Sequence, residues 1–185
     1  MPTVAIGRHN NHMGPFSGGG GGGINVCCCR ICTCVNFGFL GSRFGLMKVC
    51  EIMLASFCET LLVQFGIPYA SNIGKALFSF QAATASTYTT TVILLIVYCF
   101  SEKSFHLMRQ SLFETLFNSI SCLMYATASS YMATAAILWL YPQFLIVPGF
   151  IAYPAMVAVY WMGYVAALVY GVDAYCAYKY YKGRR

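Results

Sequence analysis

Residues 76–100 read ALFSFQAATASTYTTTVILLIVYCF and contain no charged side chain. A helix needs about 20 predominantly apolar residues, at about 1.5 Å of rise per residue, to cross the hydrocarbon core of a bilayer. Polar or turn-forming residues flank the stretch on both sides: Asn72, Gly74 and Lys75 before it, and Ser101, Glu102 and Lys103 after it. The stretch therefore predicts a membrane-spanning helix, and the neighbouring apolar stretches become candidate partners for it.

The composition of the whole chain favours the same class. Of 185 residues, 59% are hydrophobic and 9% are charged, whereas about 25% of a typical soluble domain is charged. Residues 1–23 have no apolar core of the kind that a cleaved secretory signal requires. We therefore expect an all-α integral membrane protein whose insertion begins at an internal span.

The N-terminal residues 1–40 are expected to form a disordered cytosolic tail. Residues 18–23 are all glycine, and such a run buries too little apolar surface to offset the entropy of ordering its backbone. A phosphate-binding loop is not favoured, because no GK[ST] sequence follows and no strand precedes the run.

Five of the ten cysteines lie in residues 24–35, which read INVCCCRICTCV. The cluster consists of Cys27, Cys28, Cys29, Cys32 and Cys34. Disulfides are disfavoured in the cytosol, and five crowded cysteines without a second distant pair make a poor zinc site. We favour S-acylation such as palmitoylation beside the membrane, with unmodified cysteines as the alternative.

A first span is predicted over about residues 46–67, before Pro68. It carries Lys48, Glu51, Glu59 and Gln64 as candidate intramembrane polar contacts. Lys48 is expected to reach the cytosolic surface and to pair with Glu51, one helical turn away. A carboxylate within a span is a functional candidate by default. We favour a structural role for Glu59, bonded to Gln64, Thr60 or a neighbouring helix, over proton or ion transport, since no second intramembrane charge is evident.

Two more spans are predicted over about residues 113–140 and 155–174, which makes a bundle of four transmembrane helices. The connections would lie at residues 68–75, 101–110 and 142–154, and residues 179–185 would form a basic cytosolic tail. Small residues recur at every fourth position, a pattern that lets helices approach closely. These candidate packing residues are Ala82, Ser86 and Thr90, then Ala126, Ser130 and Thr134, then Gly163, Ala167 and Gly171.

The distribution of basic residues predicts that both termini are cytosolic. In that orientation Lys75 alone lies outside. The other ten lie inside: Arg8, Arg30, Arg43, Lys48, Lys103, Arg109, Lys179, Lys182, Arg184 and Arg185. An excess of Lys and Arg on the cytosolic side is the usual rule for multispan proteins.

The four-span arrangement resembles the MARVEL family of membrane proteins. The resemblance rests on the sequence SRFGLMKVCEIMLA at residues 42–55, on cytosolic termini and on the short connection after the first span. It covers about residues 41–182, with the domain itself at about 41–178. The cysteine-rich run before the first span is similar to that of an insect protein with a role in myoblast fusion.

The resemblance implies a non-enzymatic organiser of membranes, acting in vesicle trafficking, cell apposition or fusion at the plasma membrane or on vesicles. The implied partners are membrane lipids and other membrane proteins, including further copies of the chain, and not nucleic acid. No catalytic nucleophile with a base, no metal-ligand set and no cofactor-binding loop is apparent in the sequence, and His106 has no partner at a recognisable spacing. The alternatives are a structural component of cell junctions, of the smooth septate type, and a small proton-coupled transporter using Glu51 and Glu59.

Overall fold

The computed structural model describes residues 37–100 and 102–183, and the structure there is all-α. Within these ranges no residue belongs to a β-strand. The described residues belong to one compact unit. The elements are α1 (Phe37–Leu40), α2 (Arg43–Leu61), η1 (Leu62–Gly66), η2 (Ile67–Tyr69), α3 (Ala70–Phe100), α4 (Glu102–Gln110), α5 (Leu112–Ala135), η3 (Ala136–Leu140), α6 (Tyr141–Ile146) and α7 (Ala152–Lys182).

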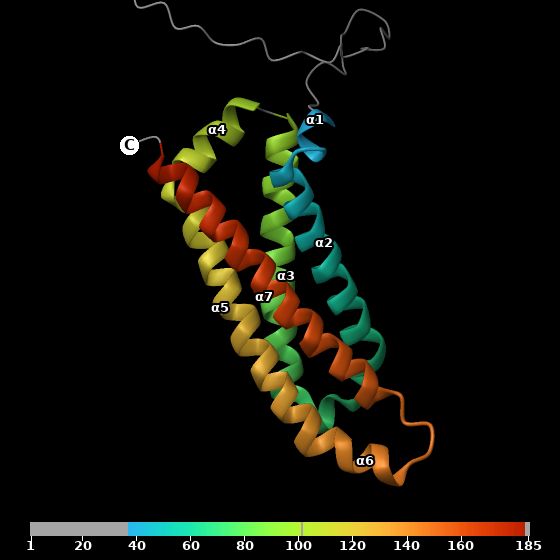
Figure 1. Ribbon diagram of the computed structural model, residues 1–185. Coiled ribbons are helices and arrows are strands. Elements are labelled where there is room, and N and C mark those ends of the chain that lie inside the picture. Colours follow the sequence, from blue (N-terminus) through green and yellow to red (C-terminus); the bar gives the residue numbers. More distant parts are fainter. Residues whose placement is uncertain (1–36, 101, 184–185) are drawn as a thin grey trace, which may run out of the picture. The chain divides into compact units, whose positions relative to one another are not determined.

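Four long helices, α2, α3, α5 and α7, pack along one another (Figure 1). The pair α5 and α7 forms the most extensive contact, and α2 packs against both α3 and α7. The beginning of α2, the end of α3, the beginning of α5 and the end of α7 lie together beside α4. We call this region the α4 end, and the opposite region, beside α6, the α6 end.

The predicted loop at residues 68–75 is wrong, because these residues are helical. The chain reverses between α2 and α3 through η1, a π-helical turn, and η2, a 3₁₀ turn that contains Pro68 near its start. Proline is tolerated in a first helical turn, where its missing N–H would have no partner. Residues 70–75 accordingly form the first turns of α3 rather than a connection.

The predicted connections at 142–154 and 101–110 are also largely helical. After α5 the chain continues through the π-helical η3 into α6, so the turn is confined to the residues between Ile146 and Ala152. Gly149 adopts a positive φ of 85° there, which glycine accepts without steric cost. Helix α7 extends to Lys182, so residues 179–182 of the predicted tail continue the helix. The ten residues after α3 form mainly α4.

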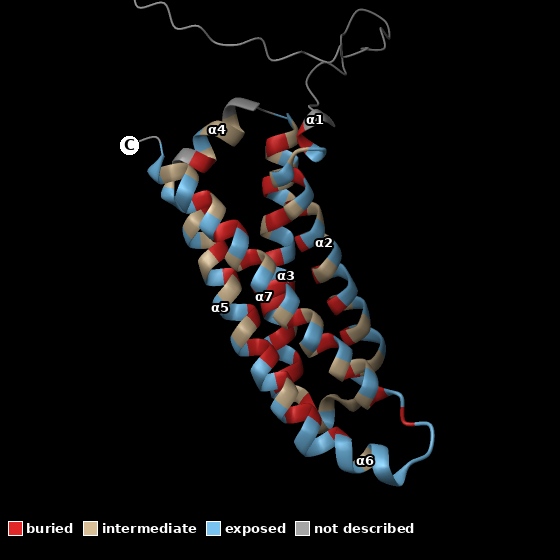
Figure 2. Ribbon diagram, in the orientation of Figure 1, coloured by how far each residue is buried: buried red, intermediate tan, exposed pale blue. Residues whose placement is uncertain are grey.

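The long helices bury small and polar residues and expose large apolar ones, the reverse of a soluble protein. Thr84, Thr87 and Thr91 of α3 are buried, whereas Phe78 and Ile93 of the same helix are more than half exposed. Figure 2 shows exposed residues along the outer faces of all four long helices. The interior at the α6 end and middle is nonetheless packed, with Phe80, Tyr125, Met132 and Met156 among its fully buried side chains.

Among the described residues, two stretches are long and apolar enough to cross a membrane, Leu112–Ile146 and Ala152–Lys182. The predicted spans at about residues 46–67 and 76–100 are not among them. Only 39% and 33% of the most apolar windows of the two stretches are buried within the structure. The core helix of a soluble protein would be mostly buried, so apolar faces of this length need an apolar solvent around them. The chain is therefore a membrane protein.

Candidate functional site

Five charged side chains and one amide are buried together at the α4 end. We call this set the ionic cluster. It consists of Lys48 and Glu51 from α2, Arg109 from α4, Glu114 and Asn118 from α5, and Asp173 from α7. Each of the six residues is at most 1% exposed. The cluster thus joins four separate helices within a volume that the solvent does not reach.

Asp173 contacts three other members of the cluster, each on a different helix. Its Oδ1 accepts a hydrogen bond from Arg109 Nη2 at 2.8 Å. Its Oδ2 accepts from Asn118 Nδ2 at 2.8 Å and lies 2.8 Å from Lys48 Nζ. One carboxylate on α7 therefore holds α2, α4 and α5, and charge-assisted bonds of this kind are about twice as strong as neutral ones.

Lys48 lies among several acceptors. Besides Asp173, its ammonium group donates to Glu51 Oε2 at 3.0 Å and to Asn118 Oδ1 at 3.1 Å. An ammonium group has three donors, so these three acceptors satisfy it completely. Glu114 Oε1 lies farther away, at 4.0 Å.

Arg109 places its guanidinium group between acids and aromatic rings. Its Nε lies 3.2 Å from Glu114 Oε2, in addition to the bond from Nη2 to Asp173. Its Cζ lies 3.7 Å from the centroid of the Phe44 ring, a cation–π contact. Arginine suits this environment because its guanidinium is planar, weakly hydrated and always charged. Phe44 and Phe105 pack on the apolar side of the same end, beside Phe39 and Tyr98.

The cluster is not fully satisfied by hydrogen bonds. Glu51 Oε1, both carboxylate oxygens of Glu114 and Nη1 of Arg109 are buried without a hydrogen-bond partner, as is the Tyr98 hydroxyl. The cluster also contains two bases and three acids, so it is formally anionic when every group is ionised. Removing one partner of a buried ion pair costs about 3–5 kcal/mol, because the charge of the other partner is left uncompensated.

The expectations for the first span are only partly met. Lys48 does pair with Glu51, but its ammonium does not reach the membrane surface, because Asp173, Glu51 and Asn118 hold it in the interior. Two further acids, Glu114 and Asp173, lie in the same cluster as Glu51. Gln64 is exposed rather than bonded to Glu59.

Glu59 belongs to a smaller polar contact between α2 and α3. Gln81 Nε2 donates a hydrogen bond to Glu59 Oε1 at 3.1 Å, whereas Oε2 is buried and has no partner. The partner of Glu59 is therefore a neighbouring helix, α3, and not Gln64 or Thr60. Glu59 is partly buried and is not connected to the ionic cluster by any hydrogen bond or ion pair in the described part of the chain.

The candidate packing stripes differ in where they lie. Ala82, Ser86, Ser130 and Thr134 are exposed, and Thr90 and Ala126 are half-buried, so these two stripes do not line the interior. The buried residues are displaced by one position, as at Ala83, Thr87 and Ser129. The stripe on α7 is the most buried of the three: Gly163 and Ala167 are buried, and Gly171 is half-buried beside Cys122 of α5. The exposed Ser130 of α5 nonetheless lies 2.9 Å from the Tyr164 hydroxyl of α7.

Sequence reasoning missed four members of the ionic cluster. Arg109 falls in a predicted connection, Glu114 at the start of a predicted span and Asp173 at the end of another, and Asn118 was not singled out. Each charged residue lies near the end of an apolar stretch, where a charged side chain ordinarily reaches water. The available signal was opposite charge, because the predicted bundle brings these acids and bases to the same end of the helices.

Two further sequence predictions concern other side chains. His106, for which no partner was found by spacing, lies with its Nδ1 3.1 Å from the Tyr180 hydroxyl of α7. The predicted S-acylation cluster at residues 27–34 and the glycine run lie outside the described residues. No group of three or more His, Cys, Asp or Glu side chains within residues 37–100 and 102–183 could hold a metal ion.

The chain was compared with known proteins. It is 56% identical over 167 residues to the protein singles bar of Drosophila melanogaster, an alignment that covers 90% of this chain and 95% of the relative. No protein-family model matches the chain, so the MARVEL assignment stays a prediction, and no solved structure matches it. Because more than half of the aligned residues are identical over nearly the full length of both proteins, the chain belongs to the singles bar family.

Proposed function

We propose that this protein is a four-span membrane protein, with both termini in the cytosol, that promotes vesicle delivery or membrane merging where two cells are already attached. The identity of 56% with singles bar over 90% of the chain carries the proposal. The family resemblance implies a role in myoblast fusion, and the protein would act there as a non-enzymatic organiser of lipids and of other membrane proteins, including copies of itself.

The packing of α2 and α3 supports four spans rather than two. Both helices lie along the two apolar helices, since α2 packs on α7 and α3 packs on α5. Both also expose large apolar side chains, such as Phe57 of α2 and Ile93 of α3, on their outer faces. The charged residues of α2 that would oppose insertion are Lys48, Glu51 and Glu59, and each has a partner inside the protein. Pairing of this kind is how charged side chains are tolerated within a bilayer.

The charge at the two ends supports the orientation. Arg43, Lys48, Arg109, Lys179 and Lys182 all belong to segments at the α4 end, whereas Lys75 lies at the start of α3, at the α6 end. Basic residues concentrate on the cytosolic side of membrane proteins. The α4 end is therefore assigned to the cytosol, together with the N-terminal tail and its cysteine cluster.

Short connections at the α6 end support action from within the membrane. The chain turns there through residues 62–69 and through residues 147–151, which follow the short helix α6. Neither connection forms a folded domain that could reach across the gap between two cells. The protein would therefore act through its membrane-embedded faces and its cytosolic face, after adhesion has been achieved by other molecules.

Removal of the protein from muscle precursor cells tests the function. Precursors that lack it should recognise and adhere to their partners but should stall before fusion, with vesicles held at the contact. Re-expression of the full chain should restore fusion, and re-expression of an unrelated four-span protein at the same level serves as the control. Failure of adhesion would contradict the proposal. Normal fusion accompanied by a leaking epithelial barrier would favour a junctional role instead.

The topology has its own test. Epitope tags placed before Met1 and after Arg185 should be protected from protease on intact cells and cleaved after the plasma membrane is permeabilised. A tag inserted at Gly149, in the turn between α6 and α7, should be accessible on intact cells and serves as the matched control. Accessibility of either terminal tag on intact cells would refute the four-span topology.

A further inference from the structure

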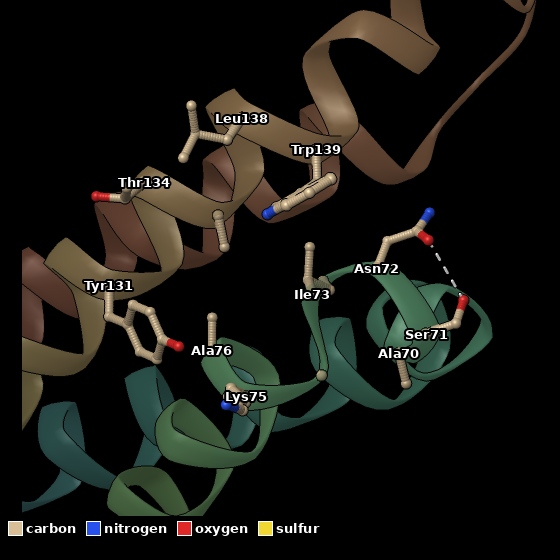
Figure 3. A pocket seen from close by; sticks show the side chains of 12 residues that line it. Ala70, Ser71, Asn72, Ile73, Lys75, Ala76, Tyr131, Thr134, Leu138 and Trp139 are labelled. Carbon is tan, nitrogen blue, oxygen red and sulfur yellow. Dashed lines mark hydrogen bonds between the residues drawn. The ribbon is translucent and has the colours of Figure 1, made fainter.

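A cavity of about 400 Å³ lies at the α6 end, between the start of α3 and the end of α5. Ser71, Asn72 and Lys75 line it from α3, and Tyr131, Leu138 and Trp139 line it from α5 and η3. Figure 3 shows the two sets on facing walls, with Ile73 beneath Trp139 and Ala76 beside Tyr131. The cavity has the size of a small-molecule site and is separate from the ionic cluster at the other end.

The two walls differ in chemistry. The α3 wall offers a hydroxyl, an amide and an ammonium group beside Ile73 and Ala76, and the other wall offers Leu138, two aromatic rings and the hydroxyls of Tyr131 and Thr134. Asn72 Oδ1 accepts a long hydrogen bond of 3.5 Å from Ser71 Oγ, and the amide nitrogen of Asn72 donates to no described residue. A ligand that fits this lining has an anionic polar head joined to an apolar body.

Lys75 has no counter-ion among the described residues. The protein contains five acidic residues. Glu51, Glu114 and Asp173 lie in the ionic cluster, and Glu59 is bonded to Gln81. Glu102 begins α4, after the far end of α3. Lys75 and Phe100 are 25 residues apart in one helix, which separates them by roughly 38 Å at 1.5 Å per residue. An anion that pairs with Lys75 must therefore come from outside the chain.

The backbone next to the cavity has an unusual conformation. Trp139 lies in η3, a π-helical segment of five residues that interrupts the α-helical course between α5 and α6. Such segments are rare, and they are often found at functional sites because they change the direction in which side chains project. Trp139 is 59% exposed and borders the cavity rather than packing in the core. Tryptophan prefers the level of the lipid headgroups, where its ring is apolar and its N–H is hydrated.

We propose that this cavity binds a phospholipid, with the lipid phosphate on Lys75 and Asn72 and the start of an acyl chain along Leu138 and Trp139. The positive charge of Lys75 favours an anionic ligand. Because Lys75 lies near the end of an apolar helix, the anion that meets it there is one held at the membrane surface. A phosphodiester also accepts hydrogen bonds, which the amide nitrogen of Asn72 can donate. The assignment to the outer leaflet, but not the binding itself, rests on the proposed topology.

The binding can be measured with the purified full-length protein in detergent micelles. The chain has two tryptophans, so Trp161→Phe in every sample leaves Trp139 as the only tryptophan reporter. A phospholipid with a spin label on its headgroup should quench Trp139 fluorescence and saturate. Lys75→Gln should weaken this binding by about tenfold, equivalent to the loss of one charge-assisted contact. Both Lys75 and the control residue Lys182 are exposed, so neither change is expected to unfold the protein.

Competition identifies the ligand. Unlabelled phospholipid should displace the labelled lipid, whereas diacylglycerol with the same chains and inorganic phosphate should do so much more weakly. Lys182→Gln, at the opposite end of the molecule, should leave the affinity unchanged. Equal displacement by diacylglycerol, equal displacement by inorganic phosphate, or unchanged affinity in Lys75→Gln would each overturn the proposal. None of these results depends on whether the protein acts in fusion, so the two proposals can fail separately.

Discussion

At the α4 end, five charged side chains and Asn118 fill the space between the helices, whereas towards the α6 end Leu62, Leu77, Met132 and Leu140 fill it. Both fillings exclude solvent, but they hold the helices by different interactions. The ionic cluster is directional, and each contact depends on an opposite charge at about 3 Å. The apolar end depends on close packing alone, since the hydrophobic effect does not draw helices together when lipid is as apolar as the interior.

This difference predicts losses of stability of different size. Loss of one charged member removes a buried counter-charge from its partners in the ionic cluster, whereas loss of volume at the apolar end leaves only a cavity that the surroundings can partly fill. Stability in each case can be measured as the free energy of unfolding of the purified protein in detergent micelles, from the denaturant dependence of the near-ultraviolet circular dichroism.

The largest effect is expected from Asp173→Asn. The substitution keeps the shape of the side chain but removes the charge that faces both Lys48 and Arg109. The free energy of unfolding should fall by about 3–5 kcal/mol, because Lys48 and Arg109 lose the buried carboxylate that they share. A loss no larger than that of Glu59→Gln, the same chemical change elsewhere in the bundle, would show that Asp173 does not organise the cluster.

A double substitution sharpens this result. Lys48→Met alone should also destabilise the protein, because Glu51 and Asp173 lose their shared cation. Combined with Asp173→Leu, it should cost less than the sum of the two single changes, since apolar residues replace both members of a pair. Additive losses would mean that the two residues act independently.

A smaller effect is expected from Met132→Ala at the apolar end. Met132 is fully buried, so truncation leaves a cavity and removes dispersion contacts. We expect a loss of about 2 kcal/mol, at the low end of the range for core truncations, because transfer of the side chain to lipid carries little hydrophobic cost. Ile137→Ala, at a position that is 53% exposed to lipid, is the control and should change the stability little.

The contact between α5 and α7 can be tested by adding one methyl group. In Gly163→Ala the new Cβ would overlap Ser129 Oγ and lie 2.8 Å from the Phe80 ring, so the helices must separate. Overpacking of this kind costs about 1–3 kcal/mol. In Gly171→Ala the nearest atom is Cys122 Sγ at 3.5 Å, an ordinary contact, and the stability should not fall. Equal effects of the two substitutions would show that α7 does not approach α5 most closely at Gly163.

The smallest effect is expected from Glu59→Gln. Its single bond to Gln81 can be replaced by an amide–amide bond, and hydrogen bonds between membrane helices average about 0.6 kcal/mol. The loss should therefore be about 0.5 kcal/mol, and the reconstituted protein should conduct no protons in either form. Proton flux in liposomes that disappears in Glu59→Gln would revive the transporter hypothesis and replace the structural role of this carboxylate.

The sequence by itself determined the helical class, the approximate positions of the four long helices and the asymmetry of the basic residues. These properties depend on local composition, because 25 uncharged residues predict a helix wherever the helix packs. The helix boundaries in the structure nevertheless differ from the predicted ones. Residues 70–75, 102–110 and 141–146 are helical in the structure, because polar or proline-containing sequences are compatible with first helical turns that pattern reasoning treats as loops.

Only the tertiary structure decided which residues meet. Asp173 lies 55 residues or more from Asn118, Arg109 and Lys48 in the chain, and no local pattern links them. The sequence also did not show which face of each helix is buried. Ser86, on a predicted packing stripe, is exposed, whereas its neighbours Ala83 and Thr87 are buried. In a soluble helix the apolar side marks the interior. Here lipid and interior are both apolar, so rotation of the helices is set by packing and by the ionic cluster, which exist only in the folded protein.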